Sequence, residues 1–311
     1  MTERGVLRPA RVRVPCSTSN LGAGYDTIGL ALDRYLDVTF EPSDLGRLRL
    51  ERTGTLERLE EEDEPDLVAT VLIRELELRG VRPSGTLRMH SDIPVARGLG
   101  TSAAAVLAGY DLACAAIGEP RDDDGAFDAA LRHEGHGDNA APSLFGGLRA
   151  VAHSTAGPVV MGLTLSDAVG FAYAAPATGV STREARAGLP SQLPYRTATD
   201  ALGRLVALVR GLAEGSPDLL RIGVADELHV PYRLALIPRG PRAIDAGLAA
   251  GAWAVTVSGA GSGLIAMCDP RDAADVATAM HEVFDGGAED PECVGFAVRP
   301  SPVGLRRLST D

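Results

Sequence analysis

Residues 94–105 combine glycine with hydroxyl side chains in a pattern suited to binding phosphate. Their sequence, PVARGLGTSAAA, places Gly98 and Gly100 just before Thr101 and Ser102. Glycine lets the backbone approach a ligand closely, and the N–H groups and dipole at a helix start attract anions. We therefore predict that this loop cradles the phosphates of ATP. Taken alone, the pattern fits equally well an ordinary helix start capped by Thr101 or Ser102.

Two better-known phosphate-binding loops do not match this segment. A Walker A loop requires a lysine before serine or threonine, and residues 94–105 contain no lysine. Residues 98–103, GLGTSA, match the looser dinucleotide pattern GxGxxA, which needs a strand directly before the loop. Asp92, Pro94 and Arg97 interrupt such a strand. We therefore disfavour both a P-loop and an NAD site.

The elements expected around the loop alternate between strands and helices. Strands are expected at residues 11–15, 36–40, 48–51, 86–90, 148–152, 171–175, 253–257 and 264–268. Helices are expected at residues 67–78, 101–117, 125–133, 198–213, 218–222 and 272–284. A strand, the loop and a small-residue helix thus follow one another in a mixed α and β protein.

Two further segments bear on the organisation of the chain. The Gly157-Pro158 turn signal follows the strand at 148–152, so we place a boundary within 153–168. With 311 residues, the chain is long enough for two domains, which we expect at 1–160 and 161–311. The charged tract 57–66 is too polar to pack and predicts a solvated loop or helix start, with Asp66 as N-cap.

Composition limits the classes of partner. An apolar fraction of 45% with 23% charged residues is typical of a globular protein, and 4% aromatics imply a largely aliphatic core. A net charge of −12 argues against broad nucleic-acid or anionic-membrane binding, because either partner would repel an acidic surface. A small-molecule partner is therefore expected, with neither nucleic acid nor membrane.

Cysteine usage and the start of the chain indicate the compartment. The cysteines are widely separated and form no CxxC pair, which predicts neither a zinc site nor a disulfide framework: Cys16, Cys114, Cys268 and Cys293. The first ten residues lack the apolar stretch of a signal peptide, and no apolar run reaches the roughly 20 residues of a membrane helix. We expect a cytoplasmic protein.

Three segments resemble the GHMP kinases, a superfamily of small-molecule kinases. Residues 94–104 resemble its PxxxGLGSSAA signature, with Thr101 in place of the first serine. Residues 15–26, PCSTSNLGAGYD, and 257–261, VSGAG, resemble two further motifs and follow in the same order. This resemblance implies an ATP-dependent phosphotransferase with an alcohol acceptor. It also implies an α+β fold, with an N-terminal ribosomal S5-like domain 2 type α/β domain and a C-terminal ferredoxin-like α+β domain.

Other segments resemble the homoserine kinase branch of this superfamily. They are residues 134–147, EGHGDNAAPSLFGG, residues 181–186, STREAR, and residues 226–233, DELHVPYR. The implied reaction is phosphorylation of the L-homoserine hydroxyl to O-phospho-L-homoserine, a step toward threonine. Similar enzymes are often dimers, so a homodimer is possible, although the sequence offers no clear interface stripe.

The resemblance assigns residues to ATP and to homoserine. The ATP-binding positions are Pro94, Val95, Ala96, Arg97, Gly98, Leu99, Gly100, Thr101, Ser102, Ala103 and Ala104. The homoserine-binding positions are Asn20, Asp26, His136, Asn139, Thr182, Arg186 and Arg233. Arg186 and Arg233 would grip the carboxylate, where a guanidinium can donate paired, charge-assisted hydrogen bonds. Asp26 would hold the ammonium group. Taken singly, the two arginines would be better interpreted as solvated surface residues, and Asn20 as a turn residue.

Metal binding and catalysis complete the expected site. Magnesium prefers hard oxygen ligands and takes only one or two protein groups when it bridges phosphates, a role implied for Ser102 and Glu134. The spacing of His133 and His136 does not indicate zinc, because no cysteine or third ligand lies near. The catalytic assignments are Asn139, Asp138 and Arg186. Of these, Asp138 is the nearest carboxylate base, and Asn139 can orient the hydroxyl but cannot accept its proton.

Two departures from the family pattern leave alternatives open. Ser262-Gly263 replaces the more usual Pro-Ser/Thr after the last motif, and Asp66 replaces the asparagine of Asn-Leu-Val near the adenine. The first replacement would loosen the loop that closes over the phosphates and so change nucleotide affinity, and the preference for adenine is implied by the resemblance alone. A kinase for another hydroxylated amino acid or alcohol remains an alternative, as does a catalytically silent ligand sensor.

Overall fold

The computed structural model describes residues 7–57, 59, 65–287 and 292–310. Within these residues the strands form two separate sheets. The larger sheet has seven strands, in the order β11-β1-β2-β4-β3 with β5 and β6 continuing from β2. Its strands are β1 (Ala10–Asn20), β2 (Gly24–Pro42), β3 (Leu48–Gly54), β4 (Gly85–Ser91), β5 (Leu148–Ser154), β6 (Gly157–Gly162) and β11 (Arg306–Leu308).

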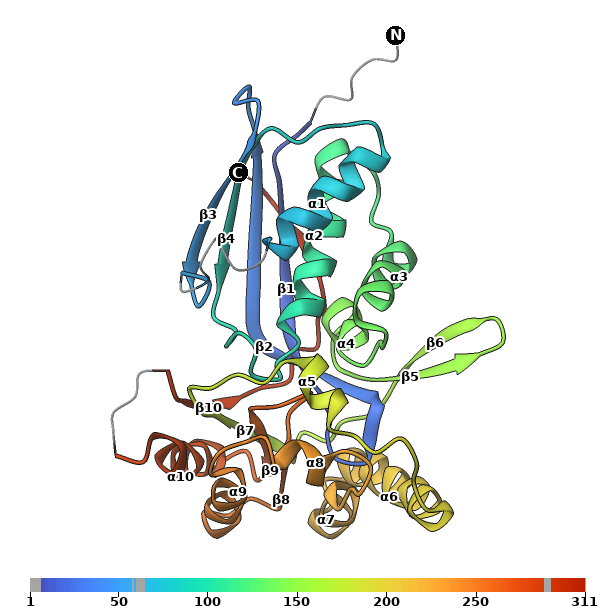
Figure 1. Ribbon diagram of the computed structural model, residues 1–311, viewed down its shortest axis with the longest axis vertical. Helices are drawn as coiled ribbons and strands as arrows, with labels where there is room; N and C mark the ends of the chain where they lie inside the picture. Colours follow the sequence, from blue (N-terminus) through green and yellow to red (C-terminus); the bar gives the residue numbers. More distant parts are fainter. Residues whose placement is uncertain (1–6, 58, 60–64, 288–291, 311) are drawn as a thin grey trace.

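Helices cover one face of this sheet (Figure 1). They are α1 (Leu67–Leu78), α2 (Thr101–Ile117), α3 (Asp123–Glu134) and α4 (Ala140–Phe145). The central helix α2 is buried along almost its whole length, and most of its buried residues are small. Small side chains let a helix approach a sheet and its neighbouring helices closely. The start of α2 is thereby fixed against the strands that carry the first motif.

The smaller sheet is antiparallel, with the strand order β10-β7-β9-β8. Its strands are β7 (Gly170–Ala175), β8 (Ala254–Val257), β9 (Leu264–Cys268) and β10 (Val294–Val298). The helices of this half of the molecule are α5 (Thr182–Ala187), α6 (Tyr195–Glu214), α7 (Pro217–Val224), α8 (Val230–Leu234), α9 (Gly240–Ala249) and α10 (Ala273–Asp285). The chain then returns to the larger sheet through β11, which pairs with β1. The division at residue 160 stays a prediction.

Every strand and helix expected from the sequence is present, with differences at the ends. The helix expected at 67–78 has these same limits, and Asp66 caps it by accepting a hydrogen bond from the Ala69 N–H at 2.9 Å. The rest of the charged tract lies mostly outside the described residues. Gly157 and Pro158 do not form the turn but begin β6, which among the described strands pairs only with β5. An edge strand tolerates proline because one side of its backbone needs no partner.

All four cysteines lie in the described part of the chain, where each is buried and none forms a disulfide bond with another described residue. Among the described helices, none combines the length and apolar character needed to cross a bilayer.

Candidate active site

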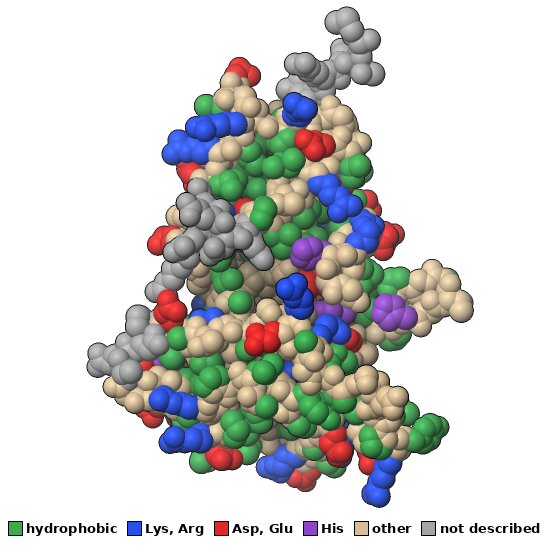
Figure 2. Space-filling view, in the orientation of Figure 1, with side chains coloured by type: hydrophobic (Ala, Val, Ile, Leu, Met, Phe, Trp, Pro, Cys, Tyr) green, Lys and Arg blue, Asp and Glu red, His purple; other side chains and the backbone are tan. Residues whose placement is uncertain are grey.

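A cleft of about 870 Å³ gathers the sequence motifs into one site. Its walls come from the β1–β2 turn, the loop before α2, the end of α3, helix α5 and the loop at 259–261. The surface is hollowed at this level between the two halves of the molecule (Figure 2). The segments whose sequences resemble the family's motifs therefore lie next to one another in the folded protein.

The loop at residues 94–100, which we call the phosphate loop, ends at the start of α2. No side chain of the described residues caps this helix start. Gly100 is the N-cap residue of α2 and has no side chain to satisfy the first N–H groups. The Thr101 hydroxyl instead donates to the Pro94 carbonyl at 3.4 Å. The alternative interpretation, in which Thr101 or Ser102 caps this helix, is therefore wrong. Uncapped N–H groups that open into a cleft suit an anionic ligand.

The two glycines of the loop are required by their protein neighbours. Gly98 and Gly100 have φ of 76° and 63°, a conformation that L side chains rarely adopt. A Cβ on Gly98 would lie 2.0 Å from the Ser258 carbonyl oxygen, and one on Gly100 would lie 2.4 Å from the Ser17 Oγ. Packing between motifs therefore excludes a larger residue here, in addition to the close approach of phosphate expected from the sequence.

Hydrogen bonds tie the phosphate loop to the other motifs. The buried Ser258 hydroxyl donates to the Gly98 carbonyl at 2.7 Å and lies 2.9 Å from the Thr18 hydroxyl. The Tyr173 hydroxyl donates to the Arg97 carbonyl at 2.6 Å. The loop is thus held from β1, from β7 and from the segment after β8.

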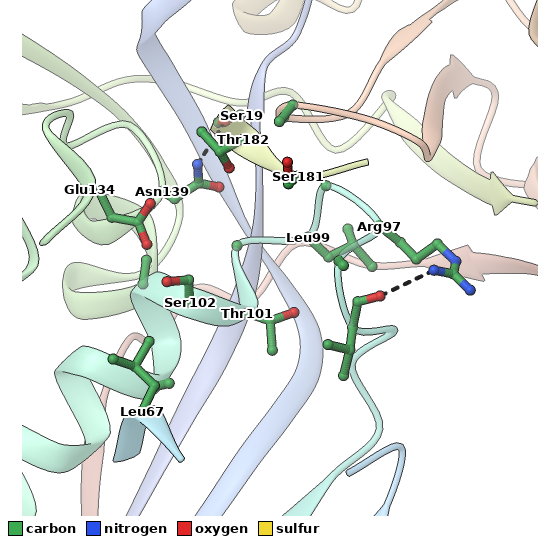
Figure 3. A pocket seen from close by; sticks show the side chains of 18 of the residues that line it. Ser19, Leu67, Arg97, Leu99, Thr101, Ser102, Glu134, Asn139, Ser181 and Thr182 are labelled. Carbon is green, nitrogen blue, oxygen red and sulfur yellow. Dashed lines mark hydrogen bonds between the residues drawn. The ribbon is translucent and has the colours of Figure 1, made fainter. Parts of the chain in front are cut away.

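Ser102 and Glu134 face the same space from two different helices. Figure 3 shows the Ser102 hydroxyl and the Glu134 carboxylate directed toward one another across the start of α2. The Glu134 side chain is only 11% exposed, and its Oε1 has no hydrogen-bond partner in the described structure. A buried carboxylate oxygen without a donor is costly unless a cation or a donor binds it. This pair therefore fits the oxygen chemistry of a bound Mg²⁺.

The Asn139 amide is held in one orientation by two serines of β1. Its Nδ2 donates to the Ser19 Oγ at 2.9 Å (Figure 3). Its Oδ1 accepts from the Ser17 hydroxyl at 3.1 Å. Ser19 also lines the cleft, so its hydroxyl is positioned by Asn139. Sequence analysis missed Ser19, although it lies within the first motif.

Asp138 lies behind His136 and does not line the cleft. The Asp138 carboxylate is 1% exposed and is hydrogen-bonded to the His136 Nδ1. Burial would raise the pKa of Asp138, but the hydrogen bond and charge of His136 outweigh it and lower this pKa. Burial likewise opposes protonation of His136, yet Asp138 raises its pKa. A buried carboxylate with a lowered pKa is a poor base, so this position favours orienting His136 over direct proton transfer.

Asp26 and Arg186 form an ion pair across the cleft. The Arg186 Nη2 lies 2.8 Å from the Asp26 Oδ1, and its Nη1 donates to the Tyr25 hydroxyl at 3.1 Å. Burial alone would lower the pKa of Arg186, but Asp26 raises it. Asp26 also lies close to His136 and Asp138, with one ligand atom of each within 4.8 Å of the others. The cationic and anionic groups expected to bind an amino acid are thus side by side.

Arg233 is buried, which excludes the alternative that it is a solvated surface residue. It is 2% exposed, and its Nη1 donates to the Gly259 carbonyl at 2.7 Å. Its guanidinium lies 5.1 Å from the centre of the Tyr25 ring. Burial lowers the pKa of Arg233, against the opposing effect of Tyr25 and Asp26. A buried arginine whose Nε has no partner in the described structure is a strong candidate for binding an anion.

His229 and Asp226 fix the short helix that carries this arginine. The Asp226 carboxylate accepts the N–H groups of His229 and Val230 at 2.8 and 2.9 Å, which fixes the start of α8. The His229 Nε2 lies 2.9 Å from the Gly22 carbonyl, and its ring stacks on Tyr25 at 4.9 Å. The DxxHxPY element therefore joins α8 to the β1–β2 turn.

The far end of the cleft has apolar walls and one buried ion pair. The apolar side chains there are Leu36, Leu56, Leu59, Leu67, Val68, Met89 and Val95. The Arg52 Nε lies 3.1 Å from the Asp66 Oδ2, and both side chains are largely buried. The cleft thus runs from apolar walls to the charged cluster, with the phosphate loop between them. Asp66 lines this end of the cleft, and the adenine-side role of its segment stays a prediction.

Nearly all expected site residues line this one cleft. Pro94, Ala104 and Asp138 are the exceptions. Ala104 is fully buried in α2, and Pro94 contributes its carbonyl to Thr101. Tyr25 lies within the first motif, but its place in the sequence does not indicate a role, because only the folded chain brings both arginines to its ring.

Comparisons with known proteins agree with this arrangement. The model of the GHMP kinases N terminal domain matches residues 66–147, and that of the GHMP kinases C terminal domain matches residues 208–286. Together these models cover about half of the chain. The solved structure of L. major mevalonate kinase shares this fold, with a TM-score of 0.68, 14% identity and coverage of 96% of this chain and 98% of that one. The chain therefore belongs to the GHMP kinase family.

Within this family the chain groups with the homoserine kinases. It is 36% identical over 280 residues to homoserine kinase from Microchaete diplosiphon, covering 90% of this chain and 91% of that protein. It is 37% identical over 291 residues to homoserine kinase from Prochlorococcus marinus, with 92% of each covered. The crystal structure of homoserine kinase from Cytophaga hutchinsonii has a TM-score of 0.80, 25% identity and 99% coverage of each chain.

Proposed function

We propose that this enzyme transfers the γ-phosphoryl group of ATP to the side-chain hydroxyl of L-homoserine. The products are O-phospho-L-homoserine and ADP, and the reaction serves threonine biosynthesis in the cytoplasm. One observation supports this proposal most directly: a single cleft contains both an uncapped helix start and the ion pair of Asp26 and Arg186. The first feature suits a polyphosphate, and the second suits a zwitterion.

The contacts in the cleft support a specific placement of the amino acid. The guanidinium groups of Arg186 and Arg233 lie 5.8 and 5.1 Å from the centre of the Tyr25 ring, where both can donate to the substrate carboxylate. Asp26, with His136 close to it, offers an acceptor to the ammonium group. Asn20 holds the turn by accepting from the Asp26 N–H at 2.9 Å. Helix α5 adds a threonine hydroxyl, that of residue 182, to the same cleft.

Phosphoryl transfer depends mainly on alignment and on neutralising charge. Residues 95–103 would hold the phosphates with backbone N–H groups at the start of α2. Ser102 and Glu134 would hold Mg²⁺, which supplies positive charge to the phosphates when bound. Asn139 and Ser19 would orient the acceptor hydroxyl, and Asp138 would act through His136. We infer that no strong base is needed.

A coupled assay tests this function. ADP release should depend on ATP and on L-homoserine together, and the product should be identified as O-phospho-L-homoserine. A panel of L-serine, L-threonine and hydroxylated alcohols would reveal a kinase with another acceptor. The proposal fails if L-homoserine produces no ADP. Binding of both ligands without turnover would instead support a silent sensor.

A further inference from the structure

The Arg97 side chain binds protein backbone, although Arg97 is one of the positions expected to bind ATP. Its Nη2 donates to the Ala177 carbonyl, and its Nη1 donates to the Val95 carbonyl at 3.4 Å. Figure 3 shows the guanidinium directed away from Ser102 and Glu134, the pair that suits Mg²⁺. The charge of Arg97 is therefore spent on holding another segment of the chain.

The segment that this guanidinium holds connects β7 to α5. It comprises residues 176–181, which we call the β7–α5 segment. Besides Ala177, it contains Val180, whose N–H donates to the Ala96 carbonyl at 3.3 Å. Between these two residues lies Gly179, where a Cβ would come within 3.0 Å of the same Ala96 carbonyl oxygen. The β7–α5 segment thus lies directly against the phosphate loop.

A third hydrogen bond reaches this segment from the loop that follows β8. The Ser262 hydroxyl is buried and donates to the Thr178 carbonyl at 2.6 Å. Of the three bonds, only the one from Arg97 has a charged donor. Such bonds are roughly twice as strong as those between neutral groups. Arg97 should therefore contribute most to the position of the segment.

Helix α5, which follows the segment, has little packing of its own. It contains six residues, of which only Ala185 is buried. Its Thr182 and Arg186 nevertheless line the cleft, and Arg186 pairs with Asp26 there. A short helix with so little buried surface is not fixed by packing, so its place depends on the bonds at its ends. The β7–α5 segment provides those bonds at the first end.

We propose that Arg97 is a positioning residue for the amino-acid substrate. By holding the β7–α5 segment it fixes the place of α5, and with it the Arg186 guanidinium that would grip the carboxylate. This inference rests on the proposed function, because it assigns a part in binding homoserine. The phosphate loop itself is also held by Ser258 and Tyr173, so its backbone should still bind ATP when the Arg97 side chain is removed.

Steady-state kinetics separates this role from a contact with ATP. Arg97→Ala should raise KM for homoserine about tenfold and leave KM for ATP within about twofold of wild type. Arg97→Lys keeps a charged donor and should recover part of the loss. Arg239→Ala is the matched control, because Arg239 also donates to two backbone carbonyls, those of Val283 and Phe284, outside the cleft. It should leave both KM values unchanged.

Three kinetic results would overturn the proposal. A rise in KM for ATP alone would assign the Arg97 side chain to the nucleotide. Equal rises in both KM values would indicate general damage to the phosphate loop. Unchanged kinetics in Arg97→Ala would show that the side chain positions nothing that the reaction needs.

A double-mutant cycle tests whether Arg97 acts through Arg186. If it does, adding Arg97→Ala to Arg186→Ala should lower kcat/KM for homoserine by no more than about threefold further. If the two residues act independently, the effects of the single variants should multiply. Multiplied effects would contradict the proposal.

Limited proteolysis tests the position of α5 without any turnover. Arg183 is exposed on α5, where trypsin can cleave after it. Arg97→Ala should speed this cleavage at least about threefold, because a less firmly held helix opens more often. Mass spectrometry identifies the cleaved bond, and Arg239→Ala should cleave there at the wild-type rate. Circular dichroism verifies that each variant is folded.

This readout distinguishes failure of the inference from failure of the proposed function. An unchanged rate of cleavage after Arg183 in Arg97→Ala overturns the inference, whatever the substrate of the enzyme. A wild-type enzyme that releases no ADP with homoserine overturns the proposed function. Faster cleavage in Arg97→Ala would then still support the positioning of α5 by Arg97.

Discussion

At the residue scale, two of the charged groups in the cleft are paired with one another. Asp26 and Arg186 neutralise one another at 2.8 Å. An amino-acid zwitterion carries a carboxylate for the arginine and an ammonium for the aspartate, so it can replace both partners together. A ligand with only one charge would leave the other group unpaired, at a free-energy cost. The pair therefore favours amino acids over simple alcohols.

Arg186→Ala should weaken homoserine use more than nucleotide use. Loss of a charged hydrogen bond costs about 1.5–3 kcal/mol, so KM for homoserine should rise about 10- to 100-fold. KM for ATP should stay within about twofold, because the contacts of Arg186 are with Tyr25 and Asp26 rather than with the phosphate loop. Steady-state kinetics with each substrate varied in turn measures this split. Equal increases in both KM values would contradict the assignment.

Glu134→Gln should impair turnover by weakening the binding of Mg²⁺. The amide keeps the size of the side chain but removes the charge, and we expect kcat/KM to fall about 100-fold at limiting Mg²⁺. Excess Mg²⁺ should restore part of this loss, whereas Ser102→Ala should show a smaller defect of the same kind. Glu77→Gln, on the exposed side of α1, is the control and should behave as wild type. A Glu134→Gln enzyme with unchanged magnesium dependence would remove Glu134 from this role.

At the element scale, the start of α2 is shaped by contacts from other elements. Gly100 packs against Ser17 of β1 and against Asn139 before α4, and Gly98 packs against the segment after β8. The small residues of α2 let the helix lie deep in the core. The geometry of the phosphate loop is therefore set by tertiary packing as well as by the local preference of glycine.

Gly100→Ala should disrupt this geometry beyond the cost of its backbone conformation. Gly80 is a suitable control, because it has a φ of 74° but open space around its Cβ position. Gly80→Ala should lower the free energy of unfolding by about 1–2 kcal/mol without changing kinetics. Gly100→Ala should lower stability further and raise KM for ATP, because the new Cβ contacts Ser17 and Asn139. Chemical denaturation and kinetics on both variants test the difference. Equal effects would show that backbone conformation alone matters.

At the scale of the whole molecule, α8 connects the second half of the chain to the first motif. His229 is fully buried between the Gly22 carbonyl and the Tyr25 ring. Burial lowers its pKa to about 4, with Arg233 adding to the effect against the opposing charge of Asp226. The folded protein therefore holds this histidine neutral under conditions in which an unfolded chain would protonate it.

This depressed pKa predicts acid sensitivity of the fold. The unfolded histidine binds a proton as pH falls below 6.5, whereas the folded one does so only near 4. Stability from this residue is complete above pH 6.5 and falls by up to about 3 kcal/mol between 6.5 and 4. His229→Asn should flatten that part of a melting-temperature profile, while His153→Asn, at an exposed site, should not. An unchanged slope in His229→Asn would contradict the prediction.

Sequence by itself determined the family, the order of the motifs and most strands and helices. Local signals suffice for these, such as the glycines before α2 and the Asp66 cap of α1. Only the tertiary structure decided which charges meet. It paired Asp26 with Arg186, placed Asp138 behind His136 and buried Arg233, because partners far apart along the chain fix each environment.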